Sequence, residues 1–202
     1  MVLDLITIGW RYTMDFRRPT TTAPAQTPEE AYRQLRSLAD ESALRNLGAL
    51  YSMAVDDHDI DTVVAMFAED GSFTRAGHTV QGHTALRDFY IGMMDRYVTT
   101  LHIPNSHVIT VDDDTATGIL TGQAELSLNG TLMMAAYRYD DRYARQDGRW
   151  VFAARTLKFM YVVPIEQMPT SFGDSKRIRW PETPYAEADL PEALPTWDSY
   201  KC

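Results

Sequence analysis

The second half of the chain consists of long runs of alternating apolar and polar residues, separated by short turn sequences. The runs cover residues 101–111, 115–128, 131–146 and 150–162. Asn129-Gly130 and Asp147-Gly148 lie between successive runs, and Asn-Gly between two alternating runs is the strongest short-range signal for a β-hairpin. The pattern predicts long antiparallel strands in sequence, and strands of this length favour a strongly curved sheet with one face buried.

The residues before these runs predict helices. Thr27 is suited to cap a helix and Pro28 to begin one, and acidic residues follow in the first turn. Apolar residues then recur three and four apart as far as Ala54, which indicates one long amphipathic helix or two in line. We expect a short helix at 60–67, closed by residues 69–71, a strand pair at 72–76 and 78–81 that turns at Gly77, and a third helix at 83–98.

Helices followed by a strand meander are typical of an α+β fold and not of alternating βαβ units. We predict a cone-shaped barrel in which a strongly curved antiparallel sheet packs on three N-terminal helices, as one domain over 27–162. Residues 1–26 are rich in Pro, Thr and Ala and are interpreted as an N-terminal extension, either an ordered arm or a stretch that precedes a true start at Met14. The tail, 163–202, contains Trp180 and Trp197 and should pack on the domain or on a neighbouring subunit.

Composition excludes several classes of function. The net charge of -9, with scattered basic residues, argues against nucleic acid and anionic membranes as partners. A single cysteine, Cys202, permits no intramolecular disulfide and no cysteine metal site. No apolar stretch reaches the roughly 18 to 20 residues that span a bilayer, and the N-terminus is a poor signal peptide. We therefore expect a cytoplasmic protein.

Five short motifs occur in a fixed order along the chain. They are 47–59 (LGALYSMAVDDHD), 63–71 (VVAMFAEDG), 81–86 (QGHTAL), 100–102 (TLH) and 143–150 (YARQDGRW). Together they resemble the SnoaL-like branch of the nuclear-transport-factor-2-like superfamily, over about residues 30–162. The resemblance implies one deep pocket for a small organic molecule, no cofactor, and association of the subunits as a homo-oligomer, a trimer or a dimer.

Members of this superfamily include dehydratases, dehydrochlorinases, isomerases, polyketide cyclases, subunits of ring-hydroxylating dioxygenases and binding proteins, so the fold does not fix the function. Two readings remain open. One is a cofactor-independent lyase or isomerase acting on a small hydrophobic cyclic substrate, such as a polyketide, terpenoid or steroid-like compound. The other is a non-catalytic binding or accessory protein, including a role like that of a dioxygenase small subunit.

Asp56 and His102 fall on the positions where dehydratase-like and dehydrochlorinase-like members pair a helix-end aspartate with a strand histidine. A histidine titrates near neutral pH and can accept a proton from carbon, while a neighbouring carboxylate fixes its tautomer and stabilises the imidazolium. The alternative is an aspartate of the bend and a structural histidine.

Tyr51 matches a tyrosine that donates a proton or polarises a carbonyl in bile-acid-dehydratase-like members. The alternative is that Tyr51 only packs in the core. Those members also use an aspartate where this chain has Ala124.

Four further residues are predicted to bind substrate. Lys158 and Arg155 lie on the last strand, where relatives place a cation, but residues three apart on a strand point to opposite faces, so at most one can face the pocket. Met53 and Met133 belong to a set of methionines suited to line an irregular apolar cavity or to fill the core. His107, five residues after His102, should point to the other face of its strand. We expect no metal site, because nothing completes a ligand set around Asp56 and His102.

Overall fold

The computed structural model describes residues 23–201. Its residues from Arg36 onward form one compact unit, and those up to Leu35 are grouped apart from it. The fold and the site below belong to the unit that begins at Arg36. Most of the predicted N-terminal extension, including Met14, lies outside the described residues, as does Cys202.

Three helices precede most of the sheet. The first, α1 (Pro28–Asp56), is one uninterrupted helix. Of the two predicted possibilities, one long helix or two in line, the first is therefore correct. A left-handed residue, His58, turns the chain into α2 (Ile60–Ala65), whose first turn is capped by the Asp59 carboxylate accepting a hydrogen bond from the Thr62 amide at 3.0 Å. The third helix, α3 (His83–Met94), begins where the sequence predicts and ends four residues earlier.

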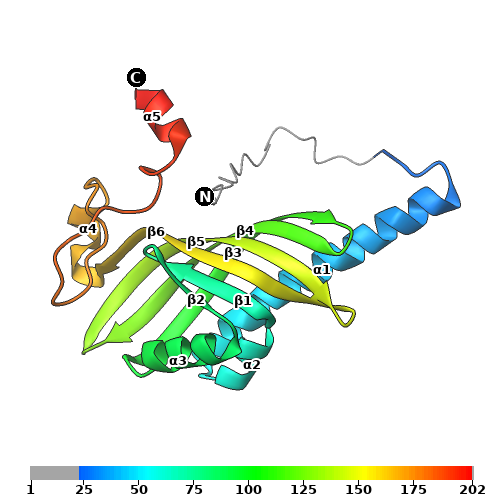
Figure 1. Cartoon of the computed structure of the whole chain (residues 1–202). Helices are drawn as coiled ribbons and strands as arrows, with labels where there is room; N and C mark the ends of the chain where they lie inside the picture. The colour runs from blue at the N-terminus through cyan, green and yellow to red at the C-terminus, as the bar shows by residue number, and fades with distance from the viewer. Residues whose placement is uncertain (1–22, 202) are drawn as a thin grey trace, which may run out of the picture. The chain divides into compact units, whose positions relative to one another are not determined.

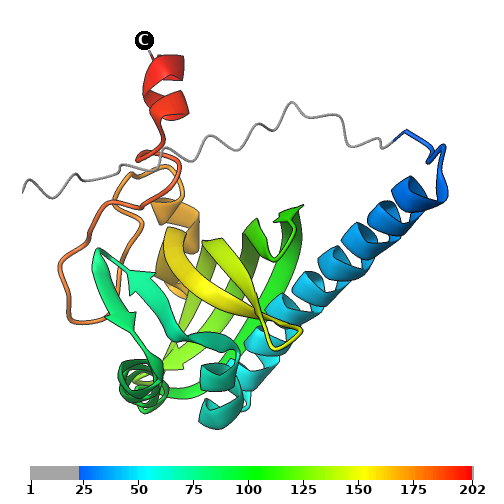
Figure 2. The same cartoon turned by 45° about the vertical axis from the view of Figure 1, so that its right-hand side comes forward.

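Six strands form one sheet, shown in Figures 1 and 2. They are β1 (Phe67–Arg75), β2 (His78–Gln81), β3 (Tyr97–Asp112), β4 (Thr115–Leu128), β5 (Thr131–Gln146) and β6 (Arg149–Pro164), in the order β2-β1-β6-β5-β4-β3. The α+β class and the curved sheet are confirmed. The sheet is not a closed barrel, because β2 and β3 remain its edges.

Long-range pairing corrects two further predictions. The sheet is not wholly antiparallel, since β1 pairs with β6 in parallel. Strand β1 begins at Phe67, so the Glu69-Asp70-Gly71 sequence predicted to close a helix lies within a strand that has an irregular register between Phe67 and Ser72. A Cβ on Gly71 would lie 2.8 Å from the carbonyl oxygen of Phe152 and 2.9 Å from that of Ala68, which is why this irregularity requires glycine.

The hairpins form as the turn sequences predict. Asn129 and Gly130 have φ of 51° and 75°, and Asp147 and Gly148 have φ of 50° and 76°. Positive φ at both central residues is the turn geometry that matches the twist of the flanking strands. The two turns set the register of β4 with β5 and of β5 with β6, and so determine which side chains face inward.

The C-terminal half of α1 packs against the concave face of the sheet (Figure 2). A Cβ on Gly48 would lie 2.7 Å from Leu120 Cδ1, so the missing side chain lets the helix approach β4 closely. The buried carboxylate of Asp40 accepts hydrogen bonds from Arg145 Nη2 at 2.6 Å and from Trp150 Nε1 at 3.0 Å. These hydrogen bonds connect the middle of α1 to the β5–β6 hairpin.

An ion pair lies in the centre of the fold. Arg155 and Asp141 are both fully buried, and the guanidinium donates two hydrogen bonds of 2.8 Å to the carboxylate. The guanidinium also lies 4.2 Å from the centre of the Tyr51 ring and 4.0 Å from that of Tyr139. The bidentate geometry and the aromatic faces compensate for the dehydration of both charges.

The chain after β6 returns along that strand. It passes through α4 (Met168–Ser171) before Ile178 makes bridges to Val162 and Ala186. The Asp189 carboxylate accepts a hydrogen bond of 2.8 Å from the amide of Phe159, and a final short helix, α5 (Pro195–Lys201), follows. Within residues 23–201, no helix is both long and apolar enough to cross a membrane.

We predict that the two adjacent aspartates of β5 differ in their effect on stability. Asp141→Asn leaves Arg155 buried without its counter-charge and should lower the free energy of unfolding by about 3–5 kcal/mol. Asp140→Asn is the matched control, because Asp140 pairs with Lys158 at 2.5 Å in a contact that is more than one third exposed. That substitution should change stability by less than about 1 kcal/mol. Urea denaturation of both variants measures the difference, and equal losses would contradict the account.

Candidate functional site

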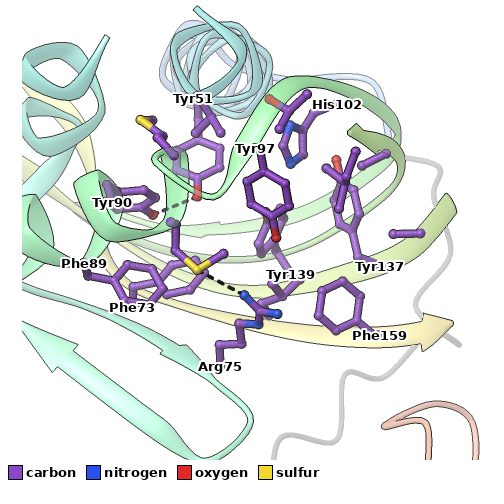
Figure 3. Close-up of a pocket in the computed structure, with 18 of the residues that line it drawn as sticks. Tyr51, Phe73, Arg75, Phe89, Tyr90, Tyr97, His102, Tyr137, Tyr139 and Phe159 are labelled. Carbon is purple, nitrogen blue, oxygen red and sulfur yellow. Dashed lines mark hydrogen bonds between the residues drawn. The ribbon is translucent and has the colours of Figure 1, made fainter. Parts of the chain in front are cut away.

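A cavity opens between the concave face of the sheet, the end of α1 and helix α3 (Figure 3). Its walls consist almost entirely of aromatic and aliphatic side chains, with a few polar groups between them. The free space, counted out to the mouth and with the open solvent there included, is about 690 Å³. Trp180 from the C-terminal tail forms part of the wall, packed edge-to-face on Phe159.

Asp56 and His102 meet at this cavity. The carboxylate accepts a hydrogen bond of 2.6 Å from His102 Nδ1, one of 2.7 Å from the His102 amide and one of 2.7 Å from the Thr100 hydroxyl. Asp56 is the last residue of α1, and Thr100 and His102 are successive inward-facing residues of β3. The last turn of the helix therefore fixes the position of the strand that carries the histidine.

The protonation of this pair follows from its hydrogen bonds. Burial raises the pKa of Asp56, but the hydrogen bonds and charge of His102, together with the Thr100 hydroxyl, outweigh it and hold that pKa below its ordinary value. An ionised carboxylate only accepts hydrogen bonds, so the proton between the two side chains belongs to Nδ1 of His102. A neutral His102 then carries its lone pair on Nε2, which is the nitrogen able to accept a proton from a bound molecule.

Tyr51 lies in the wall of the cavity with its ring edge-on to Phe152 and Tyr139. Its hydroxyl shares a hydrogen bond of 2.8 Å with that of Tyr90 on α3. Burial raises the pKa of Tyr51 well above its ordinary value, so the phenol stays protonated at neutral pH. The hydroxyl of Tyr51 also forms a hydrogen bond with that of Tyr139, and the rings of all three tyrosines contribute to the core.

Tyr137 is a polar residue of the site that the sequence did not identify. It lies on β5, and its ring is 5.9 Å from that of His102, edge-to-face. Burial raises its pKa to about 12, against a smaller opposing effect of Arg155 and of the Ser52 hydroxyl, which is the polar neighbour of the phenol. The phenol lines the cavity beside His102, so it can form a hydrogen bond with a ligand there. The alternation of β5 shows that Tyr137 faces inward, but it carries no signal that the ring lies beside His102.

None of the four side chains predicted to bind substrate lines the cavity. Arg155 faces inward but lies below the tyrosine rings, with its charge committed to Asp141. Lys158 points the other way and pairs with Asp140 near the surface. Met133 shares the inward face of β5 but is fully buried in the core, and Met53 is 60% exposed. Methionine does line the cavity from another element, at Met93 and Met94 of α3.

The prediction that His107 points to the opposite face of β3 from His102 is wrong. A register shift in β3 between Pro104 and His107 returns this side chain to the inner face. Burial lowers its pKa to about 4, so it is neutral, and its Nε2 lies 2.9 Å from the Tyr143 hydroxyl, which itself donates to Asp141. His107 thus extends the network of Arg155 and is not part of the cavity wall. In the described part of the chain, no group of three or more His, Cys, Asp or Glu residues is arranged to hold a metal ion.

Comparison with known proteins agrees with this architecture. The family model of the SnoaL-like domain matches residues 36–156, more than half of the chain. The chain belongs to the SnoaL-like domain family. No curated protein matches it.

Solved structures share the fold at low identity. The hexachlorocyclohexane dehydrochlorinase LinA-type3 of Novosphingobium barchaimii has a TM-score of 0.61 and 22% identity, over 65% of this chain and 94% of that one. A candidate scytalone dehydratase of Novosphingobium aromaticivorans has a TM-score of 0.60 and 20% identity, over 63% and 89%. An NTF2-like protein with a cystatin-like fold from the same organism has a TM-score of 0.57 and 22% identity, over 68% and 92%.

The lowered pKa of Asp56 predicts a pH-dependent contribution to stability. A carboxyl group whose pKa is lower in the folded state stabilises the fold above its ordinary value of 3.8 and loses this effect as the pH falls through the folded value. At neutral pH, the free energy of unfolding of the wild type should therefore be larger than that of Asp56→Asn. The difference should become smaller as the pH falls below 3.8, the ordinary pKa of the carboxyl group. Urea denaturation across this range tests the claim, and a difference that does not vary with pH would refute it.

Proposed function

We propose that this SnoaL-like protein is a cofactor-independent lyase or isomerase that acts on a small hydrophobic cyclic molecule. The observation that supports the proposal is the hydrogen bond of 2.6 Å between Asp56 and His102 at the wall of an otherwise apolar cavity. His102 is the general base and Asp56 its orienting partner. Such an arrangement removes a proton from carbon without a metal or an organic cofactor.

The proposed reaction begins when His102 Nε2 accepts a proton from a carbon of the bound ring. The electron pair of that C–H bond forms a carbon–carbon double bond, and in a lyase the leaving group departs from the adjacent carbon with its own bonding pair. In an isomerase there is no leaving group; the oxygen of a neighbouring carbonyl takes up the displaced electron pair as an enolate, which then receives the proton from His102 at a different carbon. Asp56 stabilises the imidazolium that forms in either case, because its carboxylate is already held against Nδ1.

Two phenols complete the proposed site. The ring of Tyr137 lies beside His102 in the cavity wall, and the hydroxyl of Tyr51 is shared with that of Tyr90. A protonated phenol donates a hydrogen bond to a carbonyl or hydroxyl oxygen and so stabilises negative charge that develops there. Ala124 pairs with His102 across the sheet and lies in the cavity wall, so no second carboxylate stands at this position. The proposal therefore assigns proton transfer to His102 alone.

The test combines binding and turnover. Native mass spectrometry first selects ligands from a panel of cyclic hydroxyketones and halogenated cyclohexanes, and the bound compounds are then incubated in D₂O and analysed for loss of the leaving group or for deuterium at carbon. His102→Ala should abolish turnover and keep binding, and Asp56→Asn should lower turnover by orders of magnitude. His78→Ala, at an exposed position of β2, is the control.

If the selected ligands bind wild type but neither eliminate nor exchange a proton, the protein is a binding or accessory protein and the enzymatic proposal is wrong. Turnover that persists in His102→Ala would reject the assignment of the base while leaving the reaction class intact.

We also propose that the protein is a homo-oligomer, a trimer or a dimer. Edge strand β3 exposes Leu101, Ile103 and Val108 on the outer face of the sheet, and exposed apolar edge strands are usually covered. Light scattering should give two or three times the chain mass of 22.9 kDa. Replacing Ile103 by Lys should shift this mass toward that of the single chain. A mass of one chain at every concentration would refute the proposal.

A further inference from the structure

Arg75 is the one permanently charged side chain among the described residues that line the cavity. It is the last residue of β1 and enters the cavity next to Met93 of α3 and Trp180 of the tail. No aspartate or glutamate lines the cavity in the described part of the chain. The lining therefore presents one cation in an apolar wall, while the Asp56 carboxylate lies behind His102.

The contacts of Arg75 leave most of its hydrogen-bonding capacity unused. Its Nη1 donates to the Met93 sulfur at 3.3 Å, and a thioether is a weak acceptor. The guanidinium lies 4.9 Å from the centre of the Trp180 ring and 5.5 Å from that of Phe159. Arg75 also donates a hydrogen bond to the Tyr97 hydroxyl, whose pKa is raised by burial and partly lowered by the charge and hydrogen bond of Arg75. It forms no ion pair with any described carboxylate.

Arg155, which also faces inward from the sheet, differs from Arg75 in having a counter-charge. Arg155 donates two hydrogen bonds to Asp141, which supplies the counter-charge within the protein. Arg75 is half-buried, and aromatic faces attract a cation but do not accept its N–H groups as a carboxylate does. A partly dehydrated guanidinium that lacks an anion is stabilised when a ligand provides one.

Arg75 and His102 enter the cavity from different sides. In Figure 3 the guanidinium of Arg75 and the imidazole of His102 point toward the same space, with Tyr97 and Tyr139 drawn between them. A flat apolar molecule placed between these residues would have one end at the cation and the other at the base. Arg75 can thus hold the molecule by a group that does not react, while His102 acts on a carbon further along.

We propose that the cavity binds a small cyclic molecule that carries a carboxylate, and that Arg75 pairs with this carboxylate. The assignment rests on the proposed function only in taking the cavity as the substrate site. The net charge of -9 repels an anion at long range, so a local cation is needed for its capture. The guanidinium fork matches both oxygens of a carboxylate, and fixing that end determines which carbon of the ring faces His102.

Binding of matched acids and amides tests the proposal. Benzoate, 1-naphthoate and their neutral amides are titrated into the protein at neutral pH by calorimetry. Each acid should bind wild type about 10- to 100-fold more tightly than its amide, the effect of hydrogen bonds to a charged group. Arg75→Met keeps the length of the side chain and removes its charge, so it should bring this ratio close to one and leave amide binding unchanged.

Three further variants make the test specific. Arg87→Met is the matched control, because Arg87 lies on α3 and pairs with Asp61 outside the cavity; it should keep the preference for the acid. Arg75→Lys keeps the positive charge and should therefore keep part of the preference for the acid. It provides a second measurement at this position if Arg75→Met does not fold. His102→Ala should also keep it, so loss of turnover is separated from loss of charge recognition. Equal binding of acid and amide by wild type, no binding of either acid, or a preference that survives in Arg75→Met would overturn the proposal.

Discussion

The carboxylate of Asp56 joins the end of the long helix to the strand that carries His102. It accepts hydrogen bonds from two side chains and one backbone amide of β3, so a single residue at the end of α1 determines both the position of that strand and the orientation of the imidazole. The carboxylate is only partly exposed, and these hydrogen bonds compensate for its dehydration. Were the carboxylate lost, the wall of the cavity and the proposed base would lose their common anchor.

The polar groups inside the sheet fall into two sets. Arg155, Asp141, Tyr143 and His107 form a connected buried network whose charges balance each other, and this network lies below the rings of Tyr51 and Tyr139. The second set faces the cavity. It comprises Nε2 of His102, the Tyr137 hydroxyl and the guanidinium of Arg75. The first set stabilises the fold, and we assign ligand binding and proton transfer to the second.

The sequence predicted the local structure well, because the alternation of the long strands and the Asn-Gly and Asp-Gly turns act over short distances. It could not predict the parallel pairing of β1 with β6, which depends on contacts between distant segments. The register shift in β3 reversed the expected direction of His107 for the same reason. Met53 follows the inward-facing Tyr51 by two residues, and on a helix that spacing places the two side chains on different faces.

The candidate site was predicted in part. Resemblance to a family located Asp56, His102 and Tyr51, all of which contribute to one region of the structure. Tyr137, Arg75 and Trp180 were missed because each lies in a segment without a motif and reaches the cavity only through the curvature of the sheet and the return of the tail. The cations on β6 were chosen by position along a strand, which does not reveal that each has an aspartate partner on β5.

The central claim is that the Asp56 carboxylate accepts a hydrogen bond from Nδ1 of His102, so that Nε2 of the neutral ring is free to accept a proton. The most direct measurement is a long-range proton–nitrogen NMR spectrum of the protein with ¹⁵N-labelled histidine, recorded at alkaline pH. We predict that His102 shows the pattern of the Nδ1–H tautomer and that Asp56→Asn changes this pattern while His83 and His107 keep theirs. A His102 that carries its proton on Nε2, or a signal that Asp56→Asn leaves unchanged, would contradict the account.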